Sequence, residues 1–442
     1  MKIHLIAIGG SAMHNLAISL FKRGFEITGS DDSIYEPSKS RLEKYNLLPK
    51  KLGWYPDRIN SQINLVILGM HAREDNPELI KAKKLNLSIL SYPEYIYEES
   101  KNKKRVVIGG SHGKTTITSM IMHVLNKAAY KFDYMVGAQL NGFDTMVKIT
   151  EESKIIILEG DEYLSSTLDK RPKFHLYKPH IAVISGIAWD HINVFPTFEN
   201  YIEQFRIFKN MVSETLIYFK DDPEVNKLIR EGVKCKMVPY ETLDHKIING
   251  STWVNNIKLK IFGKHNLQNL NAAKLVCNEL GISDCDFFKH IKSFNGAGKR
   301  LEIIKKEKNS IIFQDFAHSP SKLKATISAV KNQYKNRQLV SCLELHTFSS
   351  LDHNFLKEYH DSMINTDIAI VYYNQNTIKS KGLKNITKNI VRQSFNETKL
   401  LVFNDSKKLK YYLENIHWKN KNLLMMSSGN FDQLDLKNLK MF

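Results

Sequence analysis

The sequence predicts an α/β protein of three domains, and three observations lead to this prediction. Short continuous runs of Val, Ile and Leu alternate with helical patterns along most of the chain, as expected for parallel strands covered by helices on both faces. The 442 residues correspond to about three domains at roughly 150 residues per domain. Glycine turns that join an apolar strand to a helix occur twice, near residues 9 and 110.

The apolar runs are the predicted strands, and the segments with helical spacing between them are the predicted helices. Strands are predicted at residues 2–8, 64–69, 105–109, 154–159, 180–185, 310–315, 338–344, 367–373, 399–403 and 422–427. Helices are predicted, for example, at residues 114–127, 197–211, 266–280 and 353–365. The polar residues 98–104 predict a linker, and the glycines in 295–298 predict a hinge. The chain is therefore divided into blocks 1–103, 104–295 and 296–442.

Composition excludes several classes of protein. The content of 42% hydrophobic and 25% charged residues is ordinary for a globular chain, which excludes a disordered, collagen-like or coiled-coil protein. No run of about 18 apolar residues occurs, and the first ten residues do not form a secretory signal, so we expect a cytoplasmic protein without a membrane partner. The four cysteines show no CxxC spacing and are expected to be reduced thiols.

The excess of positive charge narrows the choice of partners. Lys and Arg number 64 and Asp and Glu 46, and the formal net charge of +18 favours anionic partners such as phosphorylated small molecules or nucleic acid. The charge is spread along the chain, without a basic stripe that carries interleaved aromatic residues for stacking on bases. We therefore expect a solvated basic surface and no nucleic-acid partner.

The strongest local signal is a phosphate-binding loop with the spacing GxxGKTT. A predicted strand leads into Gly110 and Gly113, and Lys114, Thr115 and Thr116 then open an apolar helix. Backbone N–H groups at such a helix start cradle phosphate oxygens, the lysine reaches the terminal phosphates, and the threonine hydroxyl ligates Mg²⁺. The alternative, a chance Gly-Lys-Thr at a helix start, is disfavoured by the strand before it and the helix after it.

Carboxylates follow the next strong strand candidate. The run 155–158 ends in a Glu-Gly-Asp-Glu sequence that starts at Glu159, and the run 180–185 leads to a Trp-Asp-His sequence that ends at His191. Ligands bind at the C-terminal ends of strands in open α/β sheets, and hard oxygen ligands suit Mg²⁺. A solvated acidic turn and a structural Asp–His pair are the alternatives, and the neighbouring phosphate loop favours the functional interpretation.

Taken together, the motifs resemble those of the Mur ligases. Six of them follow the order and spacing of that family over nearly the whole chain: Gly-Ser-His-Gly-Lys-Thr-Thr at 110–116, Glu-Gly-Asp-Glu-Tyr at 159–163, Trp-Asp-His at 189–191, Gly-Lys-His-Asn-Leu-Gln-Asn at 263–269, Gly-Lys-Arg-Leu-Glu at 298–302 and Asp-Phe-Ala-His-Ser-Pro at 315–320. The resemblance implies an enzyme that joins an amino acid or a peptide to a UDP-muramyl carboxylate at the expense of ATP. It also implies an N-terminal Rossmann-like UDP-substrate domain, a central P-loop ATPase domain and a C-terminal Rossmann-like domain.

The N-terminal block resembles the branch of the family that accepts UDP-N-acetylmuramate itself. Independently of the resemblance, Gly9, Gly10 and Ser11 lie between a strand and a helix, where they are suited to bind a pyrophosphate. Asp31, at the end of the second strand, is suited to a ribose hydroxyl. The resemblance also implies that Asn76 contacts this substrate.

Two kinds of ligase share this branch and differ in the amine that they add. One adds L-alanine, whereas the murein peptide ligases reattach the recycled tripeptide L-alanyl-γ-D-glutamyl-meso-diaminopimelate. Tyr163 and the basic segment 169–174 resemble the second kind, and Arg171 is a suitable partner for the carboxylates of the tripeptide. We therefore expect the tripeptide as substrate, with L-alanine as the alternative. The structural alternative for residues 170–173 is a solvated turn.

The resemblance also implies the chemistry at the phosphoryl group. The muramyl carboxylate attacks the γ-phosphate of ATP, and the amine then attacks the resulting acyl phosphate. Lys114 and Mg²⁺ offset the charge on the transferred group. Thr115 and Glu159 are the expected ligands of a first ion, and His191 is the expected ligand of a second.

The remaining nucleotide contacts are expected from two further motifs. The resemblance implies that His265, Asn266 and Asn269 meet the base, and an Asn side chain offers both the donor and the acceptor that adenine requires. The alternative is that the two asparagines only cap or decorate a helix. The resemblance also implies that three residues of the C-terminal block belong to the nucleotide site. Arg300 is expected to reach the γ-phosphate after domain closure, and Asp315 is expected to hold the ribose hydroxyls. His318 is expected to line the same site.

Two interpretations from other classes remain as alternatives. A phosphate-loop protein that binds nucleic acid is suggested by the charge alone, and a ligase-like scaffold without catalysis is disfavoured by the intact phosphate-loop and carboxylate residues. Two positions depart from the family pattern. Arg206 stands where several members carry a modified lysine, and the segment 344–350 lacks the usual arginines, so peptide contacts from the C-terminal block are not assigned.

Overall fold

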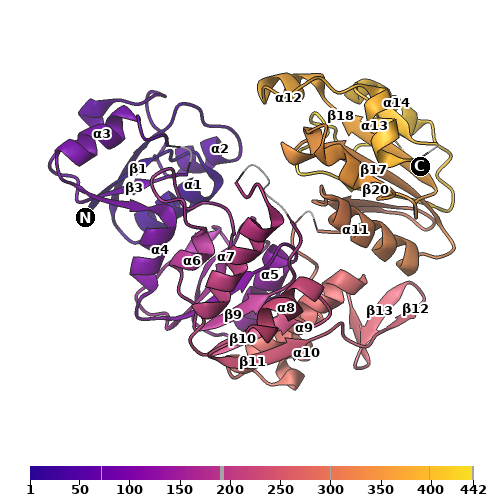
Figure 1. Ribbon diagram of the computed structural model, residues 1–442, viewed down its shortest axis with the longest axis horizontal. Coiled ribbons are helices and arrows are strands. Elements are labelled where there is room, and N and C mark those ends of the chain that lie inside the picture. The colour runs from indigo at the N-terminus through magenta and orange to yellow at the C-terminus, as the bar shows by residue number, and fades with distance from the viewer. Residues whose placement is uncertain (71, 190–193, 299, 398, 441–442) are drawn as a thin grey trace. The chain divides into compact units, whose positions relative to one another are not determined.

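The computed structural model describes residues 1–70, 72–189, 194–298, 300–397 and 399–440 (Figure 1). Within these residues the strands form three mostly parallel sheets and one small antiparallel sheet. Each of the three larger sheets falls within one of the predicted blocks, and all ten predicted strands are present. The predicted α/β class is therefore confirmed.

The N-terminal sheet has the strand order β2-β1-β3-β4, and all of its pairings are parallel. Its strands are β1 (Lys2–Ile6), β2 (Glu26–Ser30), β3 (Leu65–Leu68) and β4 (Ser88–Ser91). The helices are α1 (Ser11–Lys22), α2 (Ser38–Lys44), α3 (Pro77–Lys84) and α4 (Tyr92–Ser100), with a 3-10 helix η1 (Pro56–Arg58). Because β1 is an inner strand, the glycine turn that follows it lies at the carboxyl edge of the sheet, where ligands bind in such folds.

The central sheet has the order β11-β10-β9-β5-β8-β6-β7 and is parallel except for the last pair. Its strands are β5 (Lys104–Gly109), β6 (Asp133–Met135), β7 (Val147–Lys148), β8 (Ile155–Glu159), β9 (Ile181–Ile184), β10 (Thr215–Phe219) and β11 (Lys236–Tyr240). The helices are α5 (Lys114–Lys127), α6 (Lys173–Leu176), α7 (Phe198–Asn210), α8 (Pro223–Arg230), α9 (Lys264–Glu279) and α10 (Asp284–Ile291). The phosphate loop therefore follows an inner strand of the sheet, between β8 and β9.

The C-terminal part contains two sheets. The small antiparallel sheet consists of β12 (Lys246–Ile248), β13 (Ser251–Val254) and β14 (Ile257–Leu259). The larger sheet has the order β15-β16-β20-β17-β18-β19, with β15 antiparallel to β16. Its strands are β15 (Glu302–Lys306), β16 (Ile311–Asp315), β17 (Gln338–Leu345), β18 (Ile368–Tyr373), β19 (Leu401–Phe403) and β20 (Lys421–Met426). The helices are α11 (Pro320–Gln333), α12 (Gln375–Ser380), α13 (Lys388–Phe395) and α14 (Ser406–Glu414).

One predicted helix, at residues 353–365, is wrong. The segment contains the 3-10 helix η3 (Phe355–Tyr359) and then a turn, and another 3-10 helix, η2 (Ser349–Leu351), precedes it. The apolar side chains of Leu356, Tyr359 and Met363 are buried, which produced the helical spacing in the sequence. Asp361 has a φ of +55°, a left-handed conformation that aspartate tolerates and that ends a helix.

Two expectations from the composition, reduced cysteines and the lack of a membrane-spanning segment, can be compared with the structure. All four cysteines are free thiols, and Cys277 and Cys342 are buried. Among the described residues, no helix combines the length and the apolar character that crossing a membrane requires.

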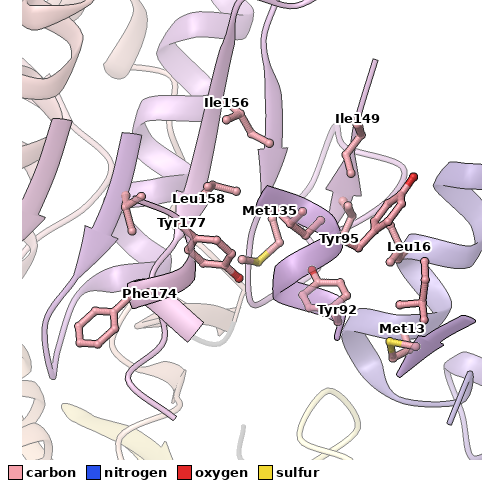
Figure 2. Packing of buried hydrophobic residues seen from close by; sticks show 14 of the residues in the cluster. Met13, Leu16, Tyr92, Tyr95, Met135, Ile149, Ile156, Leu158, Phe174 and Tyr177 are labelled. Carbon is pink, nitrogen blue, oxygen red and sulfur yellow. The ribbon is translucent and has the colours of Figure 1, made fainter. Parts of the chain in front are cut away.

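The described chain forms two compact units. Unit 1 comprises Met1–Glu241 and Asn269–His290, and unit 2 comprises Thr242–Gln268 and Ile291–Phe442. The N-terminal and central sheets therefore both belong to unit 1. They share one hydrophobic core, in which side chains of α1 and α4 pack with side chains of the central sheet and α6 (Figure 2). The labelled members are Met13, Leu16, Tyr92 and Tyr95 from the N-terminal block, and Met135, Ile149, Ile156, Leu158, Phe174 and Tyr177 from the central block.

The predicted linker at residues 98–104 connects α4 to β5, and it has exposed residues at Glu98, Lys101 and Asn102 beside buried ones at Ser100 and Lys103. Its first half is the end of α4, and Lys103 is buried, with its Nζ donating to Asp133 Oδ2 at 2.5 Å. Arg105, at the start of β5, is also buried. Its guanidinium donates to five backbone carbonyls, those of Ser100, Lys101, Lys103, Tyr177 and Lys178, at 2.8–3.2 Å. Side-chain hydrogen bonds of Lys103 and Arg105 therefore hold the connection between the two blocks.

We expect Arg105→Met to lower the free energy of unfolding by about 2–4 kcal/mol, because five backbone carbonyls, three of them in buried hydrogen bonds, lose a charged donor. Urea unfolding followed by circular dichroism measures this loss. Lys131→Met is the control, since Lys131 forms an exposed ion pair with Glu152 and its removal is expected to change the stability by less than about 0.5 kcal/mol. Equal stabilities of the two variants would contradict the role of Arg105.

Candidate functional site

The phosphate loop is held between two parallel strands. Ser185 N–H, at the end of β9, donates to Gly109 O at 3.1 Å. Gly110 has a φ of +123°, and a Cβ at this position would lie 2.8 Å from the backbone nitrogen of Ser185. Only glycine therefore fits there. Gly113 has a φ of +78° and precedes the first residue of α5, so that the N–H groups of the helix start remain available to an anion.

Lys114 lies at the centre of a set of carboxylates. Its Nζ donates to Glu162 Oε2 at 2.5 Å, and its side chain is only 14% exposed. The other oxygen of Glu162 accepts from Tyr201 OH at 3.0 Å. Burial disfavours the charge on Lys114, but Glu162 and Asp161 outweigh burial and raise the pKa of the ammonium above its ordinary value. The lysine is therefore a fixed positive charge at the helix start.

Glu159 and Thr115 supply the oxygen atoms expected of a magnesium site. Thr115 Oγ1, in the first turn of α5, donates to Glu159 Oε1 at 2.8 Å. Glu159 Oε2 accepts from Gly137 N–H at 2.7 Å. Among the described residues, no three His, Cys, Asp or Glu side chains form a metal centre by themselves. A hydroxyl and a carboxylate fit Mg²⁺ that also binds phosphate oxygens, which is its usual coordination.

Two further residues that the sequence predicts for this site are Thr116 and His191. Thr116 is buried in the first turn of α5. His191, the expected ligand of a second ion, lies outside the described residues. Gly137 and Tyr201 were not predicted, because no local pattern in the sequence distinguishes a glycine after a strand or a tyrosine on an apolar helix face.

The predicted base-binding residues lie on α9. Asn269 is buried in unit 1 beside the phosphate loop, since a Cβ on Gly113 would lie 3.1 Å from Asn269 Cγ. Asn266 belongs to unit 2, and its Nδ2 donates to Phe262 O at 2.9 Å, as expected for the helix-capping alternative. His265 lines a cavity of about 710 Å³ in unit 2, and burial lowers its pKa. The structure thus distributes these three residues over both units.

The predicted residues of the C-terminal block meet at the end of β16. Asp315 accepts from the backbone N–H groups of Leu301 and Ala317, both at 2.7 Å. The Arg300 guanidinium lies over the Phe316 ring, 4.6 Å from its centroid, and His318 Nδ1 is 2.8 Å from Phe316 O. The motif is therefore one local structure, and Asp315 organises its backbone.

The N-terminal glycine turn and Asp31 are adjacent, as predicted. Gly9 N–H donates to Asp31 Oδ2 at 2.7 Å, and a Cβ on Gly9 would lie 2.9 Å from the same oxygen. Gly10 caps α1, and Ser11 is its first residue. Burial raises the pKa of the Asp31 carboxyl. The free N–H groups at the start of this 12-residue helix are suited to a pyrophosphate.

Asn76 has a structural role in the described chain. Its Oδ1 accepts from the N–H groups of Glu78 and Leu79 at 3.0 and 3.1 Å, and it thereby caps the start of α3. Both of these N–H groups belong to the first turn of α3. That Asn76 also contacts the UDP substrate stays a prediction.

The basic segment 169–174 lies in a hairpin that spans residues 161–174 and begins at the carboxylates of Asp161 and Glu162. Its two arms meet at an isolated bridge between Leu164 and Pro172, and Lys173 Nζ donates to Asp161 Oδ2 at 2.6 Å. Lys173 Nζ also lies 5.9 Å from the centroid of the Tyr163 ring. Nε and Nη2 of Arg171 donate to the carboxylate of Asp169 at 2.7–3.1 Å, and the Arg171 side chain is 62% exposed. Both cations are thus already paired within the hairpin.

Family profiles match most of the first two blocks. The profile of the Mur ligase family catalytic domain matches residues 2–104, and that of the Mur ligase middle domain matches residues 108–277. The UDP-N-acetylmuramate–L-alanine ligase of Clostridium tetani is 30% identical over 391 residues, which cover 84% of this chain and 82% of that protein.

Solved structures show the same fold. The UDP-N-acetylmuramate–alanine ligase of Thermotoga maritima superposes with a TM-score of 0.72 at 20% identity, covering 98% of this chain and 97% of that chain. A murein peptide ligase from Psychrobacter arcticus gives a TM-score of 0.67 at 20% identity with the same coverage. From the sequence identity, its coverage and the matching fold, we conclude that this chain belongs to the Mur ligase family and is an ATP-dependent ligase that forms amide bonds.

Proposed function

We propose that this chain joins L-alanine to the carboxyl group of UDP-N-acetylmuramate, with ATP as the energy source and Mg²⁺ as the metal. The observation that carries the proposal is the alignment with the Clostridium tetani L-alanine ligase, which spans more than four fifths of both proteins. The tripeptide expected from the sequence is not confirmed, because the curated relatives favour the alternative.

In the proposed reaction, the residues of unit 1 bind and orient the reacting groups. The turn at Gly9–Ser11 holds the pyrophosphate of the UDP substrate, and the loop before α5 cradles the phosphates of ATP. Thr115 and Glu159 hold Mg²⁺, which when bound offsets negative charge on the phosphates. The muramyl carboxylate attacks the γ-phosphate, and the amine of L-alanine displaces phosphate from the acyl phosphate. Positioning and charge therefore supply most of the catalysis.

Lys114 carries the positive charge that acts on the transferred phosphoryl group. In the described chain, Lys114 donates to Glu162. In the proposed reaction, a bound triphosphate takes the place of this carboxylate as the partner of the lysine. Because the neighbouring carboxylates raise its pKa, the ammonium stays protonated at neutral and mildly alkaline pH. Its contribution to catalysis is therefore constant across the neutral and mildly alkaline range.

A second candidate substrate is the murein tripeptide, and the hairpin at residues 161–174 favours it. The hairpin base bears Asp161 and Glu162 beside Lys114, and its tip lines a cavity of about 580 Å³ in unit 1. Lys170 and Arg171 stand at this cavity with exposed side chains. A peptide with several carboxylates needs such cations, whereas L-alanine has only one carboxylate to neutralise.

Phosphate release from ATP tests the two substrates directly. The assay contains Mg²⁺ and UDP-N-acetylmuramate, and L-alanine and the tripeptide are added in parallel reactions. We expect L-alanine to support turnover and the tripeptide to give less than about a tenth of that rate. Turnover with the tripeptide alone would replace the proposal with the second candidate.

We expect Lys114→Ala to lower kcat by at least about 100-fold, because the transferred phosphoryl group loses its fixed cation. The far-UV circular dichroism spectrum is expected to match that of the wild type. The matched control is Lys131→Ala, since Lys131 forms only an exposed ion pair with Glu152 and should leave kcat unchanged. Ligation by Lys114→Ala at the wild-type rate would refute the proposed mechanism.

Arg171→Ala tests the second candidate. If the hairpin binds the tripeptide, the variant raises the KM for the tripeptide by about tenfold, as for one lost charge-assisted contact, and leaves the KM for ATP unchanged. Arg206→Ala is the control, because Arg206 is also paired with a carboxylate, Glu231, but lies on α7 outside the hairpin. An unchanged tripeptide KM in Arg171→Ala removes the hairpin from substrate binding.

A further inference from the structure

A loop of the central sheet begins at the carboxylate of Glu159. β6 runs beside β8 with Met135 opposite Leu158, and the N–H of Gly137 donates to Glu159 Oε2 at 2.7 Å. A Cβ at residue 137 would lie 2.8 Å from Oε1 of the same carboxylate, so a larger residue there would displace the Glu159 side chain from its present position. We call residues 137–146 the bridging loop. Its first residue fixes one side of the carboxylate whose other side faces Thr115.

The bridging loop ends on the first turns of helix α1. Met146 N–H donates to Asn15 Oδ1 at 2.9 Å, and Ser11 Oγ lies 3.6 Å from Met146 Sδ. Asn15 is buried, and its Nδ2 donates to Ser11 O at 2.8 Å. Ser11 directly follows the glycine turn at the start of α1. The loop therefore joins the carboxylate of the metal site to the turn suited to the pyrophosphate.

Arg41, on α2, fixes the middle of the bridging loop. Its Nη1 donates to Gln139 Oε1 at 3.0 Å, and its Nη2 donates to Asp144 O at 2.7 Å. The same Nη2 donates to Asn15 Oδ1 at 3.0 Å. One planar guanidinium thus holds the loop and helix α1 together, which the forked geometry of arginine permits and a lysine does not.

We propose that Arg41 is a positioning residue that couples binding at the Gly9–Ser11 turn to metal binding at Glu159. The inference rests on the proposed function, because it takes UDP-N-acetylmuramate as the ligand of the turn. A pyrophosphate at the start of α1 lies next to Ser11, whose carbonyl oxygen accepts from Asn15 Nδ2, and Asn15 and Arg41 hold the bridging loop. Gly137 in turn keeps the carboxylate in position. Because linkage is reciprocal, the metal raises the affinity for the UDP substrate by the same factor.

Direct binding measurements test the coupling without turnover. Mn²⁺, which is visible by electron paramagnetic resonance, is titrated onto the protein with a non-hydrolysable ATP analogue, with and without UDP-N-acetylmuramate. In the wild type we expect the UDP substrate to tighten Mn²⁺ binding by about fivefold or more, the lower range of typical couplings. In Arg41→Met we expect a factor below about twofold, with Mn²⁺ binding in the absence of UDP substrate nearly unchanged.

Two further variants make the result specific. Arg23→Met is the matched control, because Arg23 pairs with Glu99 at 2.6 Å within the N-terminal block and should keep the wild-type factor. Gln139→Ala removes one acceptor of Arg41 at an exposed position, so it lowers the factor even if Arg41→Met does not fold.

The outcomes are distinct. An unchanged factor in Gln139→Ala and in a folded Arg41→Met overturns the proposal, as does an equal loss in Arg23→Met or a wild-type factor near one. If UDP-N-acetylmuramate does not bind the wild type at all, the proposed function fails instead.

Discussion

The buried ion pair between Lys114 and Glu162 is the interaction on which the site in unit 1 depends. A charge without a partner in such a place costs several kcal/mol, so neither residue can be buried alone. The pair joins the first residue of α5 to the hairpin after β8, and Tyr201 extends the contact to α7. The phosphate loop, the carboxylates and a covering helix are therefore held in one arrangement before any nucleotide binds.

This arrangement also bears on the proposed binding of phosphate. In the proposed reaction a phosphate oxygen replaces the Glu162 carboxylate beside Lys114, so that binding exchanges one anion for another. The exchange spares the enzyme the cost of ordering a long side chain in each cycle. Glu159 is placed in the same way by Thr115 and Gly137, which donate to its two oxygens.

Much of the fold was predictable because its signals are local. The parallel strands are continuous apolar runs, and the phosphate loop is a short string whose glycines have no substitute; Gly110 shows the reason, since a Cβ there would meet a neighbouring strand. Predictions were wrong or incomplete where tertiary contacts decide. The polar residues 98–104 read as a linker because nothing in the sequence shows that carbonyls from two blocks converge on Arg105. Gly137 could not be predicted for the same reason.

The two candidate substrates rest on different parts of the chain. The identity to the L-alanine ligase extends over 84% of this chain. The hairpin is a small segment that contributes little to such an alignment, yet Glu162 at its base contacts Lys114 of the phosphate loop. Its cations are balanced by its own carboxylates, Asp169 and Asp161, so it is nearly neutral as a unit. A peptide would have to displace or share these partners.

The hydrophobic core that spans the first two blocks has a consequence for how the chain matures. The N-terminal block is synthesised before the central block, but Tyr92 and Tyr95 belong to one hydrophobic cluster with residues as late as Phe174 and Tyr177 (Figure 2). Until that part of the chain has been synthesised, an apolar face of the nascent block has no cover, and such faces associate with one another. The same reasoning applies to recombination between relatives: an N-terminal block moved into another ligase must bring a matching face of the central block with it.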